Sequence, residues 1–555
     1  MKRTYLLFSA LLITCSVSVA QKKKAAVSKN NFPATVKRPK LVVGMVIDQM
    51  RWDYLYRYYN RYSNGGFKRL INEGFSAENT FIPYTPSYTA CGHASIYTGS
   101  VPAINGIIGN DWYDPQAKRN VYCAEDSTVA TVGSNTMAGK MSPKNMLTTT
   151  ITDELRLATN FQGKVIGISL KDRGSILPAG HAANAAYWYD GGTGDWISST
   201  YYMTDLPKWV KDHNKEKLAD QYFDKNWSTL YPIDTYTQST ADNKPYEGKA
   251  RGEETPTFPH PLKLYKGKNY DMIKSTPYGN TITLDLAKLS IEKENLGQDD
   301  IMDFLAVSCS ATDYVGHQYG PNSVEAEDTY LRLDKDLEEF FNYLDKTVGK
   351  GNYLFFLSAD HGAAHVPGFM SENKLPGGTV DDSPFVKELS TLIAGKFNVK
   401  NVISRSANNQ LYLNHQSIED AKADYEAIKI FAVNYLKKQN GITDAVDISK
   451  VASSTLPEPI KKSITNGYNA DRSGDIYMIM PSGYFEGTGK TGTTHGTWYP
   501  YDTHIPCVFM GWNVQPGKTN TTHYMTDIAA TLAAMLHIQM PSGCVGSPIT
   551  ELTHQ

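Results

Sequence analysis

The chain contains four apolar runs that each end in polar, chemically capable side chains. A continuous apolar run without polar alternation predicts a strand buried on both faces, which is typical of parallel sheets covered by helices. In open α/β sheets, sites gather at the carboxyl ends of the strands, so four remote segments are predicted to meet in one crevice. The runs span residues 40–48, 164–170, 301–310 and 352–362.

Helical periodicity appears between and after these runs. Residues 323–345 carry apolar side chains at helical spacing with charged residues opposite them. Asn322 and Glu325 resemble a capping box at the start of this helix. Residues 526–538 predict a late apolar helix with Thr526 as its N-cap. The alternation predicts an α/β fold, a three-layer sandwich around a mostly parallel sheet.

Two stretches interrupt this alternation and are predicted to be insertions that wall or cover the site. Residues 183–290 are rich in Tyr, Trp, Asp, Lys, Gly and Pro, and residues 395–480 hold a helical pattern near 418–438. With 555 residues, the chain is too long for one simple core, which favours a catalytic domain with large insertions or two domains. We predict a catalytic domain over residues 39–555 that contains both insertions.

The N-terminus has the pattern of a secretory signal peptide over residues 1–20. Lys2 and Arg3 precede a short apolar stretch, and Ser18-Val19-Ala20 offers small residues for cleavage. Lipidation at Cys15 is an alternative that Thr14 fits poorly. Residues 21–38 are predicted to be a flexible lead-in, and no later run reaches 18 apolar residues, so no membrane span is expected. The protein is expected to be exported, to the periplasm or the medium.

The overall charge and the cysteine content do not change the expectation of an exported α/β protein. Lys and Arg total 55 against 57 Asp and Glu, without a basic block, so no nucleic-acid-binding surface is expected. Five cysteines remain after residue 20, an odd number that leaves at least one thiol outside any disulfide within the chain. Cys91 and Cys123 are the nearest pair in sequence, but sequence alone does not give the pairing. The oligomeric state stays open.

Candidate metal ligands follow three of the apolar runs and occupy one later loop. A single Asp or His at a strand end is more often a cap or a surface residue, but four such elements together indicate a site. Three carboxylates and three imidazoles suit zinc, and six ligands exceed what one tetrahedral zinc ion takes. Two ions would share them and leave positions open for substrate. The candidate ligands are Asp48, Asp313, His317, Asp360, His361 and His495, with His365, Asp502 and His504 as candidate supporting residues.

A candidate nucleophile lies in residues 85–99, TPSYTACGHASIYTG, a loop predicted to enter a helix near Thr89. The N-terminus of a helix offers free N–H groups to a phosphoryl group. A threonine hydroxyl becomes a useful nucleophile when a metal lowers its pKa. Thr89 could instead be only a helix cap, and Ser87 could serve equally as one, so the sequence leaves both alternatives open.

Taken together, these motifs resemble the alkaline phosphatase superfamily, and most closely its bacterial phosphate-irrepressible branch. The resemblance covers the chain from about residue 40 to the last helix, and it implies an alkaline-phosphatase-like fold. It rests on Asp48 after the first strand, Thr89 in TACGH, Asn110 in GIIGNDWYD, KDRGS at 171–175, and the segments DYVGH, ADHG and THGTWYPYD. A sulfatase is excluded, because Cys91 is not followed by the Pro and Arg of the sulfatase motif.

The resemblance implies a role for each of these residues. Asp48, Asp360 and His361 would bind one zinc ion, which also contacts Thr89, and Asp313, His317 and His495 would bind a second. Asn110, Lys171 and Arg173 match the residues that contact phosphate. Two cationic side chains and one amide suit the remaining oxygens of a dianionic monoester.

The expected function is therefore an exported alkaline phosphatase with two zinc ions that hydrolyses small-molecule phosphate monoesters through a phosphothreonine intermediate on Thr89. Two alternatives stay open. A phosphodiesterase or nucleotide pyrophosphatase could use the same scaffold, with Thr as nucleophile and an Asn like Asn110. A non-catalytic exported protein with structural zinc fits less well, because structural zinc sites are usually closed and often rich in Cys.

Overall fold

The structure is a computed structural model that describes residues 37–553. The predicted signal peptide, the Cys15 alternative and most of the predicted lead-in lie outside these residues. All elements below belong to one compact unit, Pro39–Gln555. Within the described residues, no helix combines the length and the apolar character that crossing a membrane requires.

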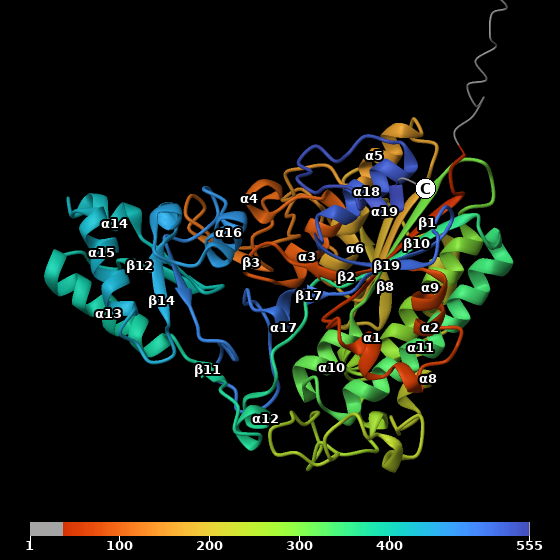
Figure 1. The fold of residues 1–555 in the computed structure, drawn as a ribbon, viewed down its shortest axis with the longest axis horizontal. Coiled ribbons are helices and arrows are strands. Elements are labelled where there is room, and N and C mark those ends of the chain that lie inside the picture. The colour runs from red at the N-terminus through yellow and green to blue at the C-terminus, as the bar shows by residue number, and fades with distance from the viewer. Residues whose placement is uncertain (1–36, 554–555) are drawn as a thin grey trace, which may run out of the picture. The chain divides into compact units, whose positions relative to one another are not determined.

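An 11-stranded mixed sheet forms the centre of this unit (Figure 1). The neighbours from β10 to β7 pair in parallel, and antiparallel strands flank them on both sides. In order across the sheet, the strands are β17 (His504–Ile505), β2 (Phe75–Phe81), β18 (Cys507–Gly511), β10 (Tyr353–Ser358), β1 (Leu41–Ile47), β9 (Asp303–Cys309), β6 (Val165–Ser169), β7 (Ala185–Asp190), β8 (Asp195–Ser199) and β5 (Thr131–Val132), and β19 (Gly517–Tyr524) pairs with β2.

Two groups of helices cover the sheet and give the three layers that the sequence predicted (Figure 1). One group contains α3 (Thr89–Thr98), α5 (Ile151–Ala158), α6 (Asp172–Ala179) and α18 (Asp527–Leu536). The other contains α2 (Phe67–Glu73), α9 (Tyr278–Lys293), α10 (Ala311–Tyr319) and α11 (Val324–Leu344). Every residue of β1, β6, β9 and β10 is buried, as expected for strands covered on both faces. The predicted α/β fold is therefore confirmed.

The range 395–480 lies within a segment that has its own small sheet and apolar cluster. The sheet consists of β12 (Ile403–Ala407), β13 (Gln410–Leu413), β15 (Ile476–Ile479) and β14 (Asp444–Asp447), in that order. The helical pattern predicted near 418–438 is interrupted, and forms two helices. The helices of the segment are α13 (Ser383–Phe397), α14 (His415–Asp420), α15 (Tyr425–Leu436) and α16 (Glu458–Gly467). We call residues 381–480 the inserted segment.

Within the range 183–290, β7 and β8 extend the main sheet and α9 packs on it. Residues 200–277 hold short helices, turns and one isolated antiparallel bridge between Trp227 and His260. The exact limits of both insertions stay a prediction. The remaining short elements are α1 (Tyr54–Arg57), α4 (Pro102–Asn105), α7 (Lys208–Lys215), α8 (Leu218–Phe223), α12 (Pro367–Glu372), α17 (Pro500–Thr503) and α19 (Thr550–Thr553), with the strand pairs β3 (Asp111–Asp114)/β4 (Arg119–Tyr122) and β11 (Gly378–Val380)/β16 (Tyr484–Glu486).

Two details at helix starts differ from the sequence-based expectation. The N-cap of α11 is Ser323, whose hydroxyl accepts a hydrogen bond from the Ala326 backbone, and not Asn322. The Asn322 side chain instead accepts from His365. Thr526 does occupy the N-cap position of α18, but its side chain makes no capping hydrogen bond.

The five described cysteines are all free thiols, so the pairing of Cys91 with Cys123 that the sequence left open does not form. Four of them are buried and Cys544 is partly buried. The fold within residues 37–553 therefore depends on packing and hydrogen bonding, not on covalent cross-links.

Replacing Ser323 by alanine removes the side-chain acceptor at the start of α11. We expect Ser323→Ala to lower the free energy of unfolding by about 1 kcal/mol, the usual cost of losing an N-cap. Thermal or denaturant unfolding of the purified variant measures this. The exposed Ser371 serves as a control, and Ser371→Ala should leave stability within about 0.5 kcal/mol of the parent. Equal stability of both variants would show that the cap contributes nothing.

Candidate active site

The carboxyl ends of three neighbouring strands bring the predicted ligands together. Strands β9, β1 and β10 lie side by side, with Val46 of β1 opposite Ser308 and Ser358. Asp48 directly follows β1, Asp360 and His361 follow β10, and Asp313 lies in the first turn of α10, just after β9. The parallel register therefore delivers these side chains to one edge of the sheet, as the sequence predicted.

Asp48, Asp360 and His361 form the first group of candidate metal ligands, with one ligand atom from each lying within 4.8 Å of the others. Nε2 of His361 lies 3.5 Å from Asp48 Oδ1 and 3.4 Å from Asp360 Oδ2. All three side chains are fully buried, yet within the described residues neither of these carboxylate oxygens has a hydrogen-bond partner. Buried acceptors without partners are costly, so a bound cation fits this group.

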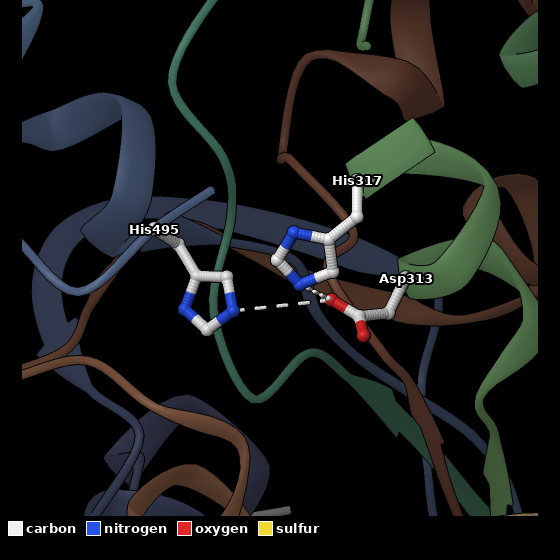
Figure 2. A group of neighbouring side chains, drawn as sticks. All are labelled: Asp313, His317 and His495. Atoms are coloured by element: carbon white, nitrogen blue, oxygen red, sulfur yellow. Dashed lines mark ion pairs between the residues drawn. The ribbon is translucent and has the colours of Figure 1, made fainter. Parts of the chain in front are cut away.

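Asp313, His317 and His495 form the second group (Figure 2). His317 comes from α10, and His495 comes from the loop before α17. Nε2 of His317 lies 3.1 Å from Asp313 Oδ1, and Nε2 of His495 lies 3.9 Å from the same oxygen. Figure 2 shows both rings turning a nitrogen toward that carboxylate. The grouping matches the one that the family resemblance implied.

All three histidines are oriented in the same way by backbone carbonyl groups. Nδ1 lies 2.9 Å from Gly362 O for His361, 2.8 Å from Thr493 O for His317 and 2.7 Å from Ser87 O for His495. A ring that donates from Nδ1 to a carbonyl keeps Nε2 as the ligand atom, which is the usual arrangement of metal-binding histidines. The orientation therefore supports a metal-binding role for each ring.

Lys171 connects the two groups of ligands. Its Nζ donates to Asp48 Oδ2 at 2.6 Å and to Asp313 Oδ2 at 2.5 Å, so one ammonium group contacts one carboxylate from each group. The rings of His361 and His495 also stack, with centroids 3.4 Å apart. The two groups are therefore parts of one site, and Lys171 lies between the carboxylates as their cation.

Burial and charge shift the pKa values of these residues in different directions. Burial and the nearby Asp313 and Asp360 raise the pKa of Asp48 well above its usual range. The pKa of Asp313 lies well below its usual range, because His317 and Lys171 outweigh the effect of burial. Burial lowers the pKa of His361 and of His495, which keeps these rings neutral and able to bind a metal.

Thr89 is the first residue of α3, and the N-cap is Tyr88, so the alternative of Thr89 as only a cap does not hold. Its Oγ1 lies 3.3 Å from His361 Nε2, beside the first group of ligands. The hydroxyl of Ser87 instead donates to Thr497 O at 2.8 Å. Thr89 is therefore the hydroxyl that faces the ligands, while Ser87 fixes the loop after His495.

Asn110, predicted to contact phosphate, lies beside the start of α3. Its Oδ1 accepts a hydrogen bond of 3.0 Å from the backbone N–H of Ala90. This bond orients the amide so that its nitrogen is the group left to donate to a ligand. The amide therefore lies next to Thr89, and its contact with phosphate stays a prediction.

Arg173 lies in the first turn of α6, which begins directly after Lys171 and packs against α3. Its Nη1 donates to the Tyr122 hydroxyl at 3.1 Å. Its Nε is buried, and within the described residues it has no hydrogen-bond partner. A buried cationic donor without an acceptor fits an anionic ligand.

Sequence reasoning missed two residues that position the ligands. Gln49 donates from Nε2 to Asp313 Oδ1 at 2.6 Å and from its backbone N–H to Asp360 Oδ1 at 3.1 Å. His93 lies one turn after Thr89, with Nδ1 2.9 Å from Thr89 O and 3.3 Å from Asp360 Oδ2. The available signals were adjacency to Asp48 for Gln49 and the spacing of four from Thr89 for His93.

A close backbone approach fixes α3 against the first group of ligands. A Cβ atom on Gly92 would lie 2.3 Å from Asp360 O and 2.6 Å from its Cα, so no side chain fits there without moving Asp360. The helix that carries Thr89 thus packs directly on the backbone of a candidate ligand.

The three candidate supporting residues differ in their roles. Asp502 is fully buried and accepts from the backbone and hydroxyl of Thr497, and its carbonyl accepts from Gly362 N–H, so it fixes both ligand loops. His504 lies against Trp52 and the Glu78 carbonyl, away from the ligands. His365 contacts Asn322.

Known proteins resemble this chain over almost its whole length. It is 61% identical over 555 residues to alkaline phosphatase PhoV of Synechococcus elongatus, with both chains fully covered. It is 56% identical to a protein of Myroides odoratus named calcium-transporting ATPase, covering 94% of this chain and 96% of the other. It is 51% identical to alkaline phosphatase PafA of Elizabethkingia meningoseptica, covering 93% and 95%.

The three-dimensional structure is also similar to that of one of these relatives. A crystal structure of wild-type alkaline phosphatase PafA matches with a TM-score of 0.91, covering 93% of this chain and 99% of that one. The sequence model of the type I phosphodiesterase / nucleotide pyrophosphatase family matches residues 42–503. The chain therefore belongs to the type I phosphodiesterase / nucleotide pyrophosphatase family, within the alkaline phosphatase superfamily, in the branch that includes PafA and PhoV.

Proposed function

We propose that this chain is an exported alkaline phosphatase that binds two zinc ions and hydrolyses phosphate monoesters through Thr89. The observation that carries this proposal is the pair of Asp/His groups beside the Thr89 hydroxyl. Among the described residues, the buried oxygens Asp48 Oδ1 and Asp360 Oδ2 accept no hydrogen bond and lie beside imidazole nitrogens. The names of PhoV and PafA, alkaline phosphatases at 61% and 51% identity, support the substrate class.

The donor atoms fit zinc, because mixed carboxylate and imidazole sets are typical of catalytic zinc sites. Asp48, Asp360 and His361 would hold one ion, and the second group would hold the other. When bound, the ions supply positive charge that lowers the pKa of a nearby hydroxyl and stabilises the oxygens of the reacting phosphate.

The residues of the chain supply the remaining chemistry. The Thr89 oxygen forms the new bond to phosphorus while the bond to the ester oxygen breaks, giving phosphothreonine and the free alcohol. Water then cleaves the phosphothreonine and releases phosphate. Asn110 and Arg173 would donate to the non-bridging oxygens, with Lys171 beside them, which is mainly positioning and charge stabilisation.

Phosphodiester hydrolysis is the second candidate, since the matching family model is named for that activity. A diester carries one charge and two non-bridging oxygens, whereas a monoester carries more charge and a third oxygen. The buried donor of Arg173 and the ammonium of Lys171 favour the ligand with more charge. A purely structural metal site is less favoured, because the ligands surround a hydroxyl and none of them is a cysteine.

Metal analysis tests the first part of the proposal. Purified protein should contain about two zinc ions per chain, and chelation should abolish activity that added zinc restores. Gly92→Ala should reduce the zinc content, because the new methyl group displaces Asp360. Gly395→Ala, at an exposed helical site with no atom within 4 Å of the added Cβ, should keep both ions. Fully active protein with one zinc ion or none would contradict the proposal.

Covalent labelling tests the nucleophile. Thr89→Ala should abolish formation of the phosphorylated enzyme in acid-quenched samples, and Thr89→Ser should retain substantial activity, because only the hydroxyl is required. Mass spectrometry of the quenched protein should place the phosphate on Thr89. Ser87→Ala is the matched control and should still be labelled. Phosphate on Ser87 would identify a different nucleophile.

Substrate preference tests the roles of Lys171 and Arg173. We expect kcat/KM to favour a monoester over a diester with the same leaving group by several orders of magnitude. Arg173→Ala should lower monoester kcat/KM by about 10- to 200-fold, the equivalent of roughly 1.5–3 kcal/mol for a charge-assisted hydrogen bond. The loss for the diester should be smaller, and Lys171→Ala should show the same bias.

Arg119→Ala is the matched control, because this exposed arginine lies in β4 and pairs with Glu125. It should leave both activities near the parent values. If Arg173→Ala and Lys171→Ala reduce monoester and diester activity equally, these residues serve the fold or the general charge of the site, and the phosphodiesterase alternative becomes preferable.

A further inference from the structure

A cavity of about 330 Å³ lies beside the candidate active site, where the inserted segment meets the metal-ligand loop. Tyr88 and His495 line it on the catalytic side. Arg405, Asn409 and Glu486 line it on the other. His495 belongs to the second group of candidate ligands, whose ion would face the oxygen that leaves the phosphorus, so the cavity adjoins the place of the leaving alcohol.

The tip of a hairpin in the inserted segment forms part of the cavity wall and is hydrogen-bonded to the loops of the candidate active site. Asn408 and Asn409 connect β12 to β13 with φ values of 58° and 59°, which is the geometry of a tight two-residue hairpin turn. Asn408 Nδ2 donates to Asp111 O at 2.7 Å, and Asn409 Nδ2 donates to Gly496 O at 3.4 Å. Asp111 follows Asn110 and Gly496 follows His495, so the turn contacts the neighbours of a phosphate contact and of a metal ligand.

Hydrogen-bond acceptors dominate the chemistry of the cavity. Asn409 is buried, and its Oδ1 has no hydrogen-bond partner within the described residues. Glu486 uses Oε2 to accept from the Asn409 backbone at 3.3 Å, and burial raises the pKa of this carboxyl group. Asp111 adds another carboxylate. A ligand that pairs with the carboxyl groups of Glu486 and Asp111 must present hydrogen-bond donors, such as hydroxyl groups.

The other lining residues restrict the size and the chemistry of the expected ligand further. The exposed Arg405 can donate to a hydroxyl oxygen, and the rings of Tyr88 and Phe485 offer apolar surface. The volume lies near the lower end of small-molecule sites, roughly 300–1,000 Å³. Two carboxylates disfavour a second anionic group. These features fit a small, uncharged polyol such as a monosaccharide.

We propose that this cavity is a subsite for the alcohol part of the substrate, and that it selects hydroxyl-rich leaving groups of monosaccharide size. Glu486 and Arg405 are the residues that determine this specificity. The proposal rests on the proposed phosphatase function, since it assigns the cavity to the leaving group of that reaction.

The test compares glucose 6-phosphate with ethyl phosphate, because both release a primary alcohol and only one carries further hydroxyl groups. We expect Glu486→Gln and Arg405→Met each to lower kcat/KM for glucose 6-phosphate by about tenfold or more, as for a lost hydrogen bond to a charged group. The loss for ethyl phosphate should be at least fivefold smaller. Glu419→Gln, an exposed change in α14 of the same segment, is the control and should leave both values near the parent.

Melting temperatures of the variants identify any loss of folding, and Arg405→Met tests the proposal even if Glu486→Gln is unstable, because Arg405 is exposed. Saturation-transfer NMR with free glucose gives a readout that is independent of hydrolysis. Transfer to glucose in the parent protein and its loss in the variants would support the subsite even if neither ester were hydrolysed, which would overturn only the proposed function. Equal losses for both esters, or no loss for either, would overturn the subsite.

Discussion

The site depends on the placement of three buried carboxylates, Asp48, Asp313 and Asp360, at the ends of adjacent strands. Charges of the same sign in a buried place are costly unless cations compensate them. Within the described residues, the ammonium of Lys171 contacts one oxygen each of Asp48 and Asp313, and imidazole nitrogens lie beside the other oxygen of each and beside Asp360. Much of the surrounding structure can be understood as a means of holding these groups in place, including the carbonyl groups that orient the rings and the amide of Gln49.

The positions of Asp48, Asp313 and Asp360 were predictable from the sequence, because each carboxylate follows or ends an apolar run that predicts a buried strand. The runs at 40–48, 301–310 and 352–362 form β1, β9 and β10, and the residues that follow them meet at one edge. In a parallel sheet the carboxyl ends of neighbouring strands meet at one edge. The residues that directly follow each predicted strand are therefore expected to lie close together. Asp313 and His317 likewise share a helix face because they are four residues apart.

The features that the sequence did not predict depend on contacts between remote segments. Nothing in the sequence around Lys171 indicates that its ammonium group lies between Asp48 and Asp313, because the three residues come from different strand connections. Gln49 has no local motif of its own. At the start of α11, two adjacent polar residues could both cap the helix, and the contact of Asn322 with His365 decides in favour of Ser323. The contacts of the Asn408–Asn409 turn with Asp111 and Gly496 likewise join remote segments, and the sequence did not predict them.

The C-terminal end of α3 lies against Cys544. The carbonyl of Gly99, the residue that ends this helix, accepts from Val545 N–H at 2.8 Å, and a Cβ on Gly99 would lie 2.5 Å from the Cys544 sulfur. Cys544 is partly buried, whereas the other four described thiols are buried. A fluorophore or spin label attached at Cys544 would therefore sit at the opposite end of the helix that begins with Thr89, and its signal would report movement of that helix during turnover without a change at the reacting atoms.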